Sequence, residues 1–371
     1  GGVAVGDVIT YFVIAQDLAG TPNISSNPAA GLVATDVNTV TTPPTTPNPF
    51  TILNSLSGTY TIGPSGNFTN IKAAVNAYNS SCITGPVVFS LTEASYSAPL
   101  DTFPITINQV TGANATNTLT IKPATGVTAA ITGNSATALI VLSGADFVTI
   151  DGSNGSTVNT VCPASVASRD LTFTNLSNST SSAVIWLATT ATSNPVTNCT
   201  VQNCVLIGNA PTTTLIGLGA GGATIGNSGT LNNNISFINN DIRACQFGIY
   251  SAGASAANKN QNLTINQNVL TAAGANSIGQ GAIYAALTNN VTISGNTIDN
   301  IVNATSAQDP VAINVGFGTI NGFSTTGTGI ADGASNVTIS NNKIGIITHS
   351  ATYSAVGIGL GNTISGTSLI A

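Results

Sequence analysis

The sequence predicts an all-β chain that is mainly a right-handed parallel β-helix with an N-terminal capping helix, preceded by a fragment of a β-sandwich domain. Three observations predict this fold. A nine-residue phrase recurs along the chain, a second short apolar segment accompanies it, and only 5% of the residues are charged although 42% are hydrophobic. Ordinary domains have about 25% charged residues, so the polar surface here must come from Asn, Thr, Ser and Gly.

The repeated phrase is clearest at residues 290–298, NVTISGNTI. Apolar residues stand at its second, fourth and ninth positions and Thr or Ser at its third, which is the alternation of a strand with one buried face. Several intervals between copies are 28 residues long, and longer intervals predict loops inserted into a fixed coil. Copies begin at Asn234, Asn262, Asn290 and Asn336, with looser copies at Asp170 and Asn198.

A coil of 28 residues has room for about three short strands. Stacking the coils about 4.8 Å apart places equivalent strands in parallel sheets. The second apolar segment supplies another sheet, in which an inward isoleucine column is worth roughly 1.5 to 3 kcal/mol per side chain. Its members are Ile185, Ile249, Ile283 and Ile358.

Asparagine occupies the seventh position of the phrase, where the chain leaves the strand. Asn tolerates left-handed backbone angles, and its amide can bond the same amide one coil above and below. We therefore expect a structural turn ladder formed by Asn240, Asn268, Asn296 and Asn342.

The first 55 residues differ from the repeat. Residues 1–42 contain two strand-like segments that resemble the end of an immunoglobulin- or fibronectin-like sandwich. Residues 43–55 are rich in Pro and Thr and predict a linker, because proline is excluded from central strands and stiffens an extended chain. The β-helix is assigned to residues 56–371.

One amphipathic helix is predicted at about residues 69–79, where Ile71, Ala74, Val75 and Tyr78 follow helical spacing. Because coils need neighbours and solenoid ends need caps, we expect this helix to cover the open apolar end of the first coil.

Composition excludes several classes of partner. The net charge is −6 and the six basic residues are scattered, which argues against nucleic-acid binding. No run of about 18 apolar residues predicts a membrane span. The cysteines lack metal-type spacing and are expected to pack in the core, with a disulfide of Cys82 or Cys162 left open. We expect no metal and no cofactor.

Groups that could carry out chemistry are few. Asp146, Asp151, Arg169 and Asp170 could come together from adjacent coils, but turn residues that satisfy backbone donors explain them as well. His349 is the only histidine and no nucleophile motif accompanies it. We therefore expect no catalytic residue.

Two outward columns are candidates for ligand binding. Trp186, Tyr250 and Tyr284 lie opposite the inward isoleucines, so they either form a platform on which sugar rings stack or are covered by an adjacent loop. A threonine column resembles ice-binding β-helices, which need paired columns, whereas here one column is regular. Its members are Thr172, Thr200, Thr264, Thr292 and Thr338.

Four segments resemble the opening of pectate-lyase-like parallel β-helix modules in large secreted surface proteins of Bacteroidota. They are TYTIGP at 59–64, LTIKPA at 119–124, FVTIDGS at 147–153 and RDLTF at 169–173. The resemblance implies tandem sandwich domains, type IX secretion and an extracellular, cell-surface location. It leaves function open, because this fold serves lyases, hydrolases, adhesins and stalks.

From the sequence we expect a non-catalytic structural or adhesive segment of a large extracellular bacterial surface protein, and not an enzyme. Its expected partners are other domains of the same long chain, surface glycans or secretion-machinery proteins. The alternative is a carbohydrate-active enzyme, either a polysaccharide lyase or a hydrolase, or a glycan-binding β-helix.

Overall fold

The computed structural model describes residues 2–158, 166–191, 194–304, 308–316, 333–361 and 364–371. Two compact units divide the chain, Gly1–Ser55 and Leu56–Ala371. Cys162, for which a disulfide is left open, lies outside the described residues.

Strands of the first unit pair antiparallel in twos. The pairs are β1 (Val8–Tyr11) with β6 (Asn48–Thr51), β2 (Val13–Gln16) with β3 (Ile24–Asn27), and β4 (Val33–Ala34) with β5 (Val40–Thr42). The expected linker at 43–55 therefore contains a strand. Pro49 is tolerated there because β6 belongs to a two-stranded ribbon, where a missing N–H costs little. That these strands belong to a sandwich domain stays a prediction.

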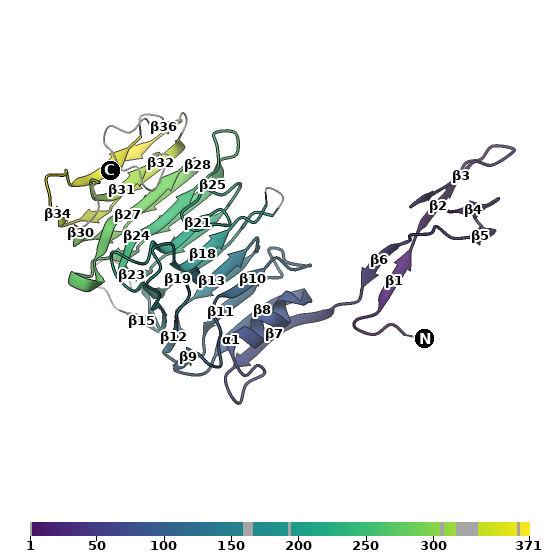
Figure 1. Cartoon of the computed structure of the whole chain (residues 1–371), viewed down its shortest axis with the longest axis horizontal. Helices are drawn as coiled ribbons and strands as arrows, with labels where there is room; N and C mark the ends of the chain where they lie inside the picture. The colour runs from purple at the N-terminus through teal and green to yellow at the C-terminus, as the bar shows by residue number, and fades with distance from the viewer. Residues whose placement is uncertain (1, 159–165, 192–193, 305–307, 317–332, 362–363) are drawn as a thin grey trace. The chain divides into compact units, whose positions relative to one another are not determined.

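In its described residues, the second unit winds through three long sheets (Figure 1). Neighbouring strands come from successive coils and pair in parallel, as β19, β22, β25 and β28 do. This arrangement confirms the predicted parallel β-helix.

The three sheets contain eleven, ten and eight strands within the described residues. The eleven-stranded sheet contains β7 (Asn54–Ile62), β8 (Ser81–Leu91), β11 (Leu119–Pro123), β14 (Val148–Asp151), β19 (Thr200–Gln202), β22 (Ile235–Ile238), β25 (Asn260–Asn266), β28 (Thr288–Ser294), β32 (Ala334–Ser340), β36 (Ile364–Ser365) and β37 (Leu369–Ile370). The ten-stranded sheet contains β10 (Ile105–Asn108), β13 (Ala138–Ser143), β18 (Ala183–Ala188), β21 (Ile216–Gly221), β24 (Cys245–Ala252), β27 (Ile278–Ala286), β30 (Ile301–Asn303), β31 (Val311–Val315), β34 (Ile347–His349) and β35 (Val356–Leu360). The eight-stranded sheet contains β9 (Ser95–Ser97), β12 (Ala129–Gly133), β17 (Leu171–Asn175), β20 (Cys204–Ile207), β23 (Asp241–Arg243), β26 (Val269–Leu270), β29 (Thr297–Ile298) and β33 (Lys343–Ile344).

Three short elements lie outside these sheets. The strands β15 (Thr157–Val158) and β16 (Val166–Ala167) form an antiparallel pair. A 3-10 turn, η1, spans Gly274–Asn276.

The repeated phrase forms the strands β19, β22, β25, β28 and β32 of the eleven-stranded sheet, in which Thr264 pairs with Thr292 and Thr292 with Thr338. The prediction that a copy of the phrase begins at Asp170 is wrong. The strand that follows it, β17, lies in the eight-stranded sheet, and β14 is the true partner of β19 in the preceding coil. An alternating apolar–Thr pattern marks any strand with one buried face, so it does not tell which sheet of the coil the strand joins.

The inward isoleucine column lies in the ten-stranded sheet. Ile185 and Ile249 are aligned through Leu218 of an intervening coil, and Ile283 and Ile358 through Ile313. All but Ile358 are buried in one continuous core. Because each residue packs on its equivalents in the adjacent coils, the core is continuous along the solenoid axis.

The seventh-position asparagines stack inside the solenoid. Asn268 uses its whole amide: Nδ2 donates to the Phe237 carbonyl oxygen (2.9 Å) and to Asn296 Oδ1 (3.0 Å). Its Oδ1 accepts from the Asn240 backbone N–H (3.0 Å) and from Asn240 Nδ2 (3.1 Å). Asn296 is bonded to Asn342 in the same way.

The left-handed turn falls one residue earlier than expected. Positive φ angles occur at the sixth position of the phrase, in Asn239 (51°), Gln267 (56°), Gly295 (67°) and Asn341 (56°). The seventh residue must instead aim its amide inward to reach the neighbouring coil. The preceding residue therefore makes the bend, at a position that Asn and Gly tolerate best.

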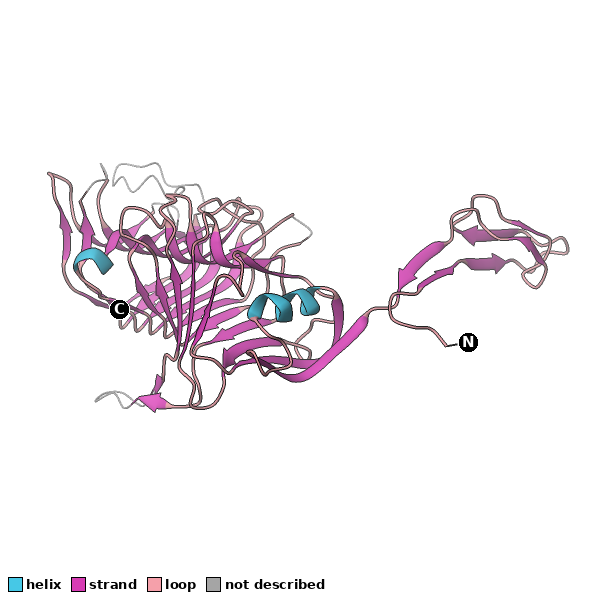
Figure 2. Ribbon diagram, turned by 60° about the horizontal axis from the view of Figure 1, so that its bottom comes forward, coloured by secondary structure: helices cyan, strands magenta, loops and turns pink. Residues whose placement is uncertain are grey.

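Helix α1 (Ile71–Asn79) packs against β8, which follows β7 in the eleven-stranded sheet, and against β10, the first strand of the ten-stranded sheet (Figure 2). Asn70 caps it by accepting the Ala73 N–H at 2.8 Å. Asn79 bonds the free edge of β10: its Nδ2 donates to the Thr106 carbonyl oxygen (2.8 Å), and its Oδ1 accepts the Asn108 N–H (2.9 Å). A terminal cap formed by α1 stays a prediction. None of the helices among the described residues is long and apolar enough to cross a bilayer.

Changing Asn268 to Leu should lower the free energy of unfolding by roughly 1 to 3 kcal/mol, because the Phe237 carbonyl oxygen and the Asn240 N–H lose their buried partner. Urea denaturation measures the change. The matched control is Asn266→Leu, at a half-exposed site two residues earlier, at the end of β25. Equal stability of the Asn268 variant and the wild type would show that the ladder does not hold the coils.

Changing Asn79 to Ala should cost about 0.5 to 1.5 kcal/mol and speed hydrogen exchange of the Asn108 amide, because α1 then no longer bonds the edge of β10. Asn76→Ala, on the exposed face of the helix, is the control. Unchanged exchange at Asn108 would argue against a capping role for α1.

Candidate functional site

The three aromatic residues proposed as a glycan platform form a buried stack. Trp186 and Tyr250 have ring centroids 5.8 Å apart, and Tyr250 and Tyr284 are 5.1 Å apart and nearly parallel, at 6°. Their exposed fractions are 1%, 2% and 1%. The platform prediction is corrected, because no ring face is open to a sugar.

Chain segments cover the stack where alternation alone would leave it exposed. Trp186 Nε1 donates to the Gly222 carbonyl oxygen, and the Tyr250 hydroxyl donates to the Gly226 carbonyl oxygen, both at 2.9 Å. The indole lies over Gly219, where an added Cβ would come within 2.6 Å of the ring. The side chains do point away from the solenoid interior as predicted, but they pack into a second hydrophobic cluster under the loop after β21.

The expected group of Asp146, Asp151, Arg169 and Asp170 is only partly brought together. Asp146 lies before β14 and bonds Thr197, whereas Asp151 lies at the other end of that strand. Asp170 accepts from the Ser168 hydroxyl and from the Asn154 N–H. These carboxylates satisfy nearby donors, as turn residues do.

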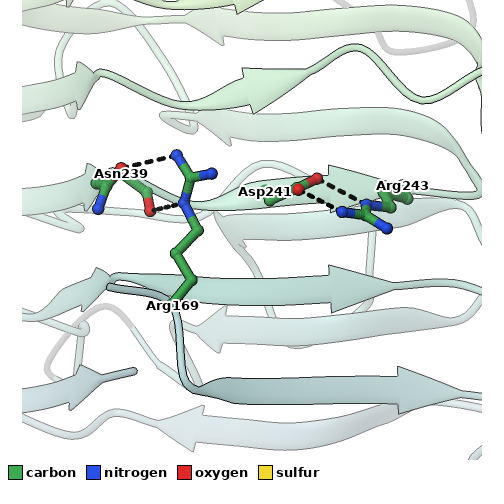
Figure 3. Close-up of polar contacts among 4 residues, drawn as sticks. All are labelled: Arg169, Asn239, Asp241 and Arg243. Atoms are coloured by element: carbon green, nitrogen blue, oxygen red, sulfur yellow. Dashed lines mark hydrogen bonds and ion pairs between the residues drawn. The ribbon is translucent and has the colours of Figure 1, made fainter. Parts of the chain in front are cut away.

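Asp151 and Arg169 are connected through two amides across successive coils. Asn203 Nδ2 donates to Asp151 Oδ1 (2.7 Å), and Asn239 Nδ2 donates to Asn203 Oδ1 (2.8 Å). Arg169 then donates from Nη2 to Asn239 Oδ1 (2.7 Å) and from Nε to the Asn239 carbonyl oxygen (2.8 Å) (Figure 3). The carboxylate and the guanidinium are therefore joined through neutral amides and not by a direct ion pair.

A second pair of charged residues lies beside this chain of hydrogen bonds, on β23 (Figure 3). Arg243 Nε donates to Asp241 Oδ1 at 2.8 Å, and its Nη2 to Asp241 Oδ2 at 2.5 Å. Asp241 raises the pKa of Arg243 through this contact, whereas burial lowers the pKa of Arg169. The sequence analysis missed this pair, although Asp and Arg two residues apart on a strand point to the same side.

The remaining titratable candidates lie elsewhere. His349 accepts the Ala351 N–H through Nδ1 (2.8 Å), and its ring contacts Tyr353. Cys199, Cys204 and Cys245 are buried in the core, as expected. Burial raises their thiol pKa, that of Cys199 to about 12, so these thiols stay protonated and unreactive.

The outward side of the eleven-stranded sheet carries half-buried hydroxyl and amide groups in register, which we call the hydroxyl face. Thr172 is not part of it, because β17 belongs to the eight-stranded sheet. One column of the face consists of Thr149, Thr200, Ser236, Thr264, Thr292 and Thr338. The next column consists of Asp151, Gln202, Ile238, Asn266, Ser294 and Ser340, in which Ile238 is the apolar member.

An exposed asparagine ladder borders the hydroxyl face. Asn234 Nδ2 donates to Asn198 Oδ1 (2.9 Å), Asn262 Nδ2 to Asn234 Oδ1 (2.7 Å), and Asn290 Nδ2 to Asn262 Oδ1 (2.9 Å). Each of these residues has a positive φ. The ladder keeps one edge of the face rigid and uncharged.

Comparison with known proteins shows similarity in fold. The structure resembles pectin methylesterase from Aspergillus niger over 85% of this chain and 88% of that chain, with 11% identity and a TM-score of 0.33. It also resembles the A-module of the mannuronan C-5 epimerase AlgE6 from Azotobacter vinelandii over 80% of this chain and 94% of that chain, with 11% identity and a TM-score of 0.30. No protein-family model and no curated protein sequence matches the chain.

The expectation that the chain is not an enzyme is corrected by this comparison, since both similar structures are of named enzymes. Scarcity of charged residues was the reason for that expectation, and it does not exclude catalysis. At this identity the likeness concerns the fold and assigns neither a reaction nor a catalytic residue to this chain.

Trp186 is the only tryptophan, so intrinsic fluorescence tests the buried stack directly. We expect iodide to quench the native protein only weakly, and the chain unfolded in guanidinium strongly, because the indole is 1% exposed. Quenching of the native protein as strong as that of the unfolded chain would mean that the ring is open to ligands.

Proposed function

We propose that this chain is a carbohydrate-active β-helix that binds a polysaccharide along its hydroxyl face. The observation that carries the proposal is the column of hydroxyls that continues in register from Thr149 to Thr338. Strands of adjacent coils lie about 4.8 Å apart, so the face offers hydrogen-bonding groups at a regular interval. A linear polysaccharide repeats its own hydroxyls regularly and matches such a surface.

The chemistry of the face favours an uncharged glycan. Hydroxyl and amide groups both donate and accept hydrogen bonds, as sugar hydroxyls do. In the two columns, the residues from β19 to β32 carry no charge, and Asp151 stands at the end formed by β14. Each contact is weak, but contacts made by one polymer along several coils add together.

An extracellular, cell-surface location belongs to the same proposal, as do an origin among secreted surface proteins of Bacteroidota and partners within a longer chain. These points are supported by the segments that resemble such modules and by the low charge content of the sequence. A glycan partner outside the cell is consistent with them.

Binding is tested by isothermal titration calorimetry with neutral polysaccharides (xyloglucan, mannan and mixed-linkage glucan) and acidic ones (pectin and alginate). We expect a neutral polysaccharide to bind. The double variant Thr264→Val and Thr292→Val should bind about 5- to 100-fold more weakly, because each lost hydrogen bond is worth roughly 0.5 to 1.5 kcal/mol.

The matched control is Thr172→Val with Thr297→Val, which removes two outward hydroxyls from the eight-stranded sheet. We expect unchanged affinity there. Absence of binding to every polysaccharide, or equal loss in both double variants, would contradict the proposal. The same mixtures are assayed for new reducing ends and unsaturated products, which would show that the protein also cleaves the polysaccharide.

A further inference from the structure

The exposed asparagine ladder beside the hydroxyl face has hydrogen-bonding groups that it does not use internally. An asparagine amide has two N–H groups and an oxygen with two lone pairs. Asn262 Nδ2 donates to Asn234 Oδ1 (2.7 Å), and Asn262 Oδ1 accepts from Asn290 Nδ2 (2.9 Å). The Asn262 amide makes no other hydrogen bond with the described residues, so one N–H and one lone pair are left for a ligand.

These amides are accessible and already ordered. Asn234, Asn262 and Asn290 are exposed, whereas Asn268 of the interior ladder is buried. The three exposed residues have φ angles of 56°, 59° and 58°, so the chain turns sharply where each strand begins. Because the bonds between amides hold the side chains in place, a ligand has little side-chain entropy to overcome when it binds them.

The ladder runs parallel to the hydroxyl column. Each ladder residue stands two positions before a member of that column, as Asn234 does before Ser236, Asn262 before Thr264, and Asn290 before Thr292. Two residues of a strand extend about 6.6 Å, and both rows repeat at the strand spacing of about 4.8 Å. A sugar ring that lies across the strands can therefore reach an amide on one side and a hydroxyl on the other.

Every bond of the ladder points the same way. Nδ2 of the later coil donates to Oδ1 of the earlier coil, from Asn290 through Asn262 and Asn234 to Asn198. Amides fixed in this manner present their unused groups in one direction at each coil. A threonine hydroxyl rotates to suit its partner, so the hydroxyl column accepts a polymer in either direction. The ladder does not.

The two ends of the ladder also differ in chemistry. At one end Asn198 Nδ2 donates to the Thr197 hydroxyl at 2.9 Å. At the other end the Asn336 amide donates to Asn289 Oδ1 (2.8 Å) and not to Asn290. Asn290 Oδ1 therefore accepts no hydrogen bond from the described residues, and the row ends in an open acceptor.

We propose that the exposed asparagine ladder is a second row of contacts for the polysaccharide and fixes the direction in which the polymer lies along the solenoid. The inference rests on the proposed binding of a polysaccharide by the hydroxyl face. A polysaccharide has a reducing end and a non-reducing end, so its two orientations offer different groups to a row of amides that all point one way. The ladder extends over four coils, from Asn198 to Asn290, and therefore recognises several successive sugars and not a single one.

The ladder variant, Asn234→Gly with Asn262→Gly, removes two amides and keeps the turns, because glycine adopts positive φ without strain. Isothermal titration calorimetry with xyloglucan, mannan and mixed-linkage glucan should show about 5- to 100-fold weaker binding than in the wild type. The matched control is Gln267→Gly with Asn341→Gly. These two residues are exposed, have positive φ and lie at the opposite border of the hydroxyl face, so this variant should bind as the wild type does.

Direction is measured in the wild type, so that test does not depend on how a variant folds. Oligosaccharides prepared from the same three polysaccharides, long enough to cover the ladder, carry a nitroxide at the reducing end. The threonine methyl signals of the hydroxyl face are followed by NMR. We expect broadening at one end of the face, near Thr200 or near Thr338, and not at both. In the ladder variant broadening should appear at both ends.

Three results would overturn the inference. They are unchanged affinity of the ladder variant, equal weakening in the control variant, and broadening at both ends of the face in the wild type. If Thr264→Val with Thr292→Val loses binding while the ladder variant does not, the hydroxyl face remains the binding site and only the role of the ladder is wrong. If the wild type binds none of the polysaccharides, both proposals are wrong.

Discussion

Hydrogen bonding between coils is the constraint on which the rest of this solenoid depends. Each coil is too thin to bury its own apolar side chains, so its strands must pair in register with those above and below. At one corner the seventh-position asparagines enforce that register from inside, because each amide joins the coil before it to the coil after it. If the strands of one coil shifted their pairing register by one residue, several buried groups would lose their partners, at a cost of about 1 to 3 kcal/mol each.

The stacking of coils also explains why the polar side chains on the surface of the solenoid are mostly uncharged. A side chain on a stacked coil lies about 4.8 Å from its equivalents in the next coils, so a charged residue at a repeated position would face like charges on both sides. Thr, Ser and Asn avoid this repulsion and bond one another, as the exposed ladder from Asn198 to Asn290 does. The few charges occur singly or in compensated groups such as Asp241 with Arg243. Such a surface favours hydroxyl-rich ligands over ionic ones.

The hydroxyl face depends on repetition. On the hydroxyl face, many weak contacts are presented by a rigid regular array, so length of the ligand matters most. The face belongs to the repeat, so each added coil extends it by one more row of hydrogen-bonding groups.

Periodic patterns in the sequence by themselves determined the parallel β-helix, a helix at about 69–79, the inward isoleucines and the stacking positions of the asparagines. The helix follows from the spacing of its apolar residues, and the other features recur because each copy of the phrase repeats the same local requirement. Tertiary structure alone decided which sheet the strand after Asp170 joins, that residues 48–51 pair with β1, that Trp186 lies under a loop, and that Asp101 is buried against the start of α1. Those outcomes depend on irregular connections between coils, which bring together residues that no fixed spacing relates.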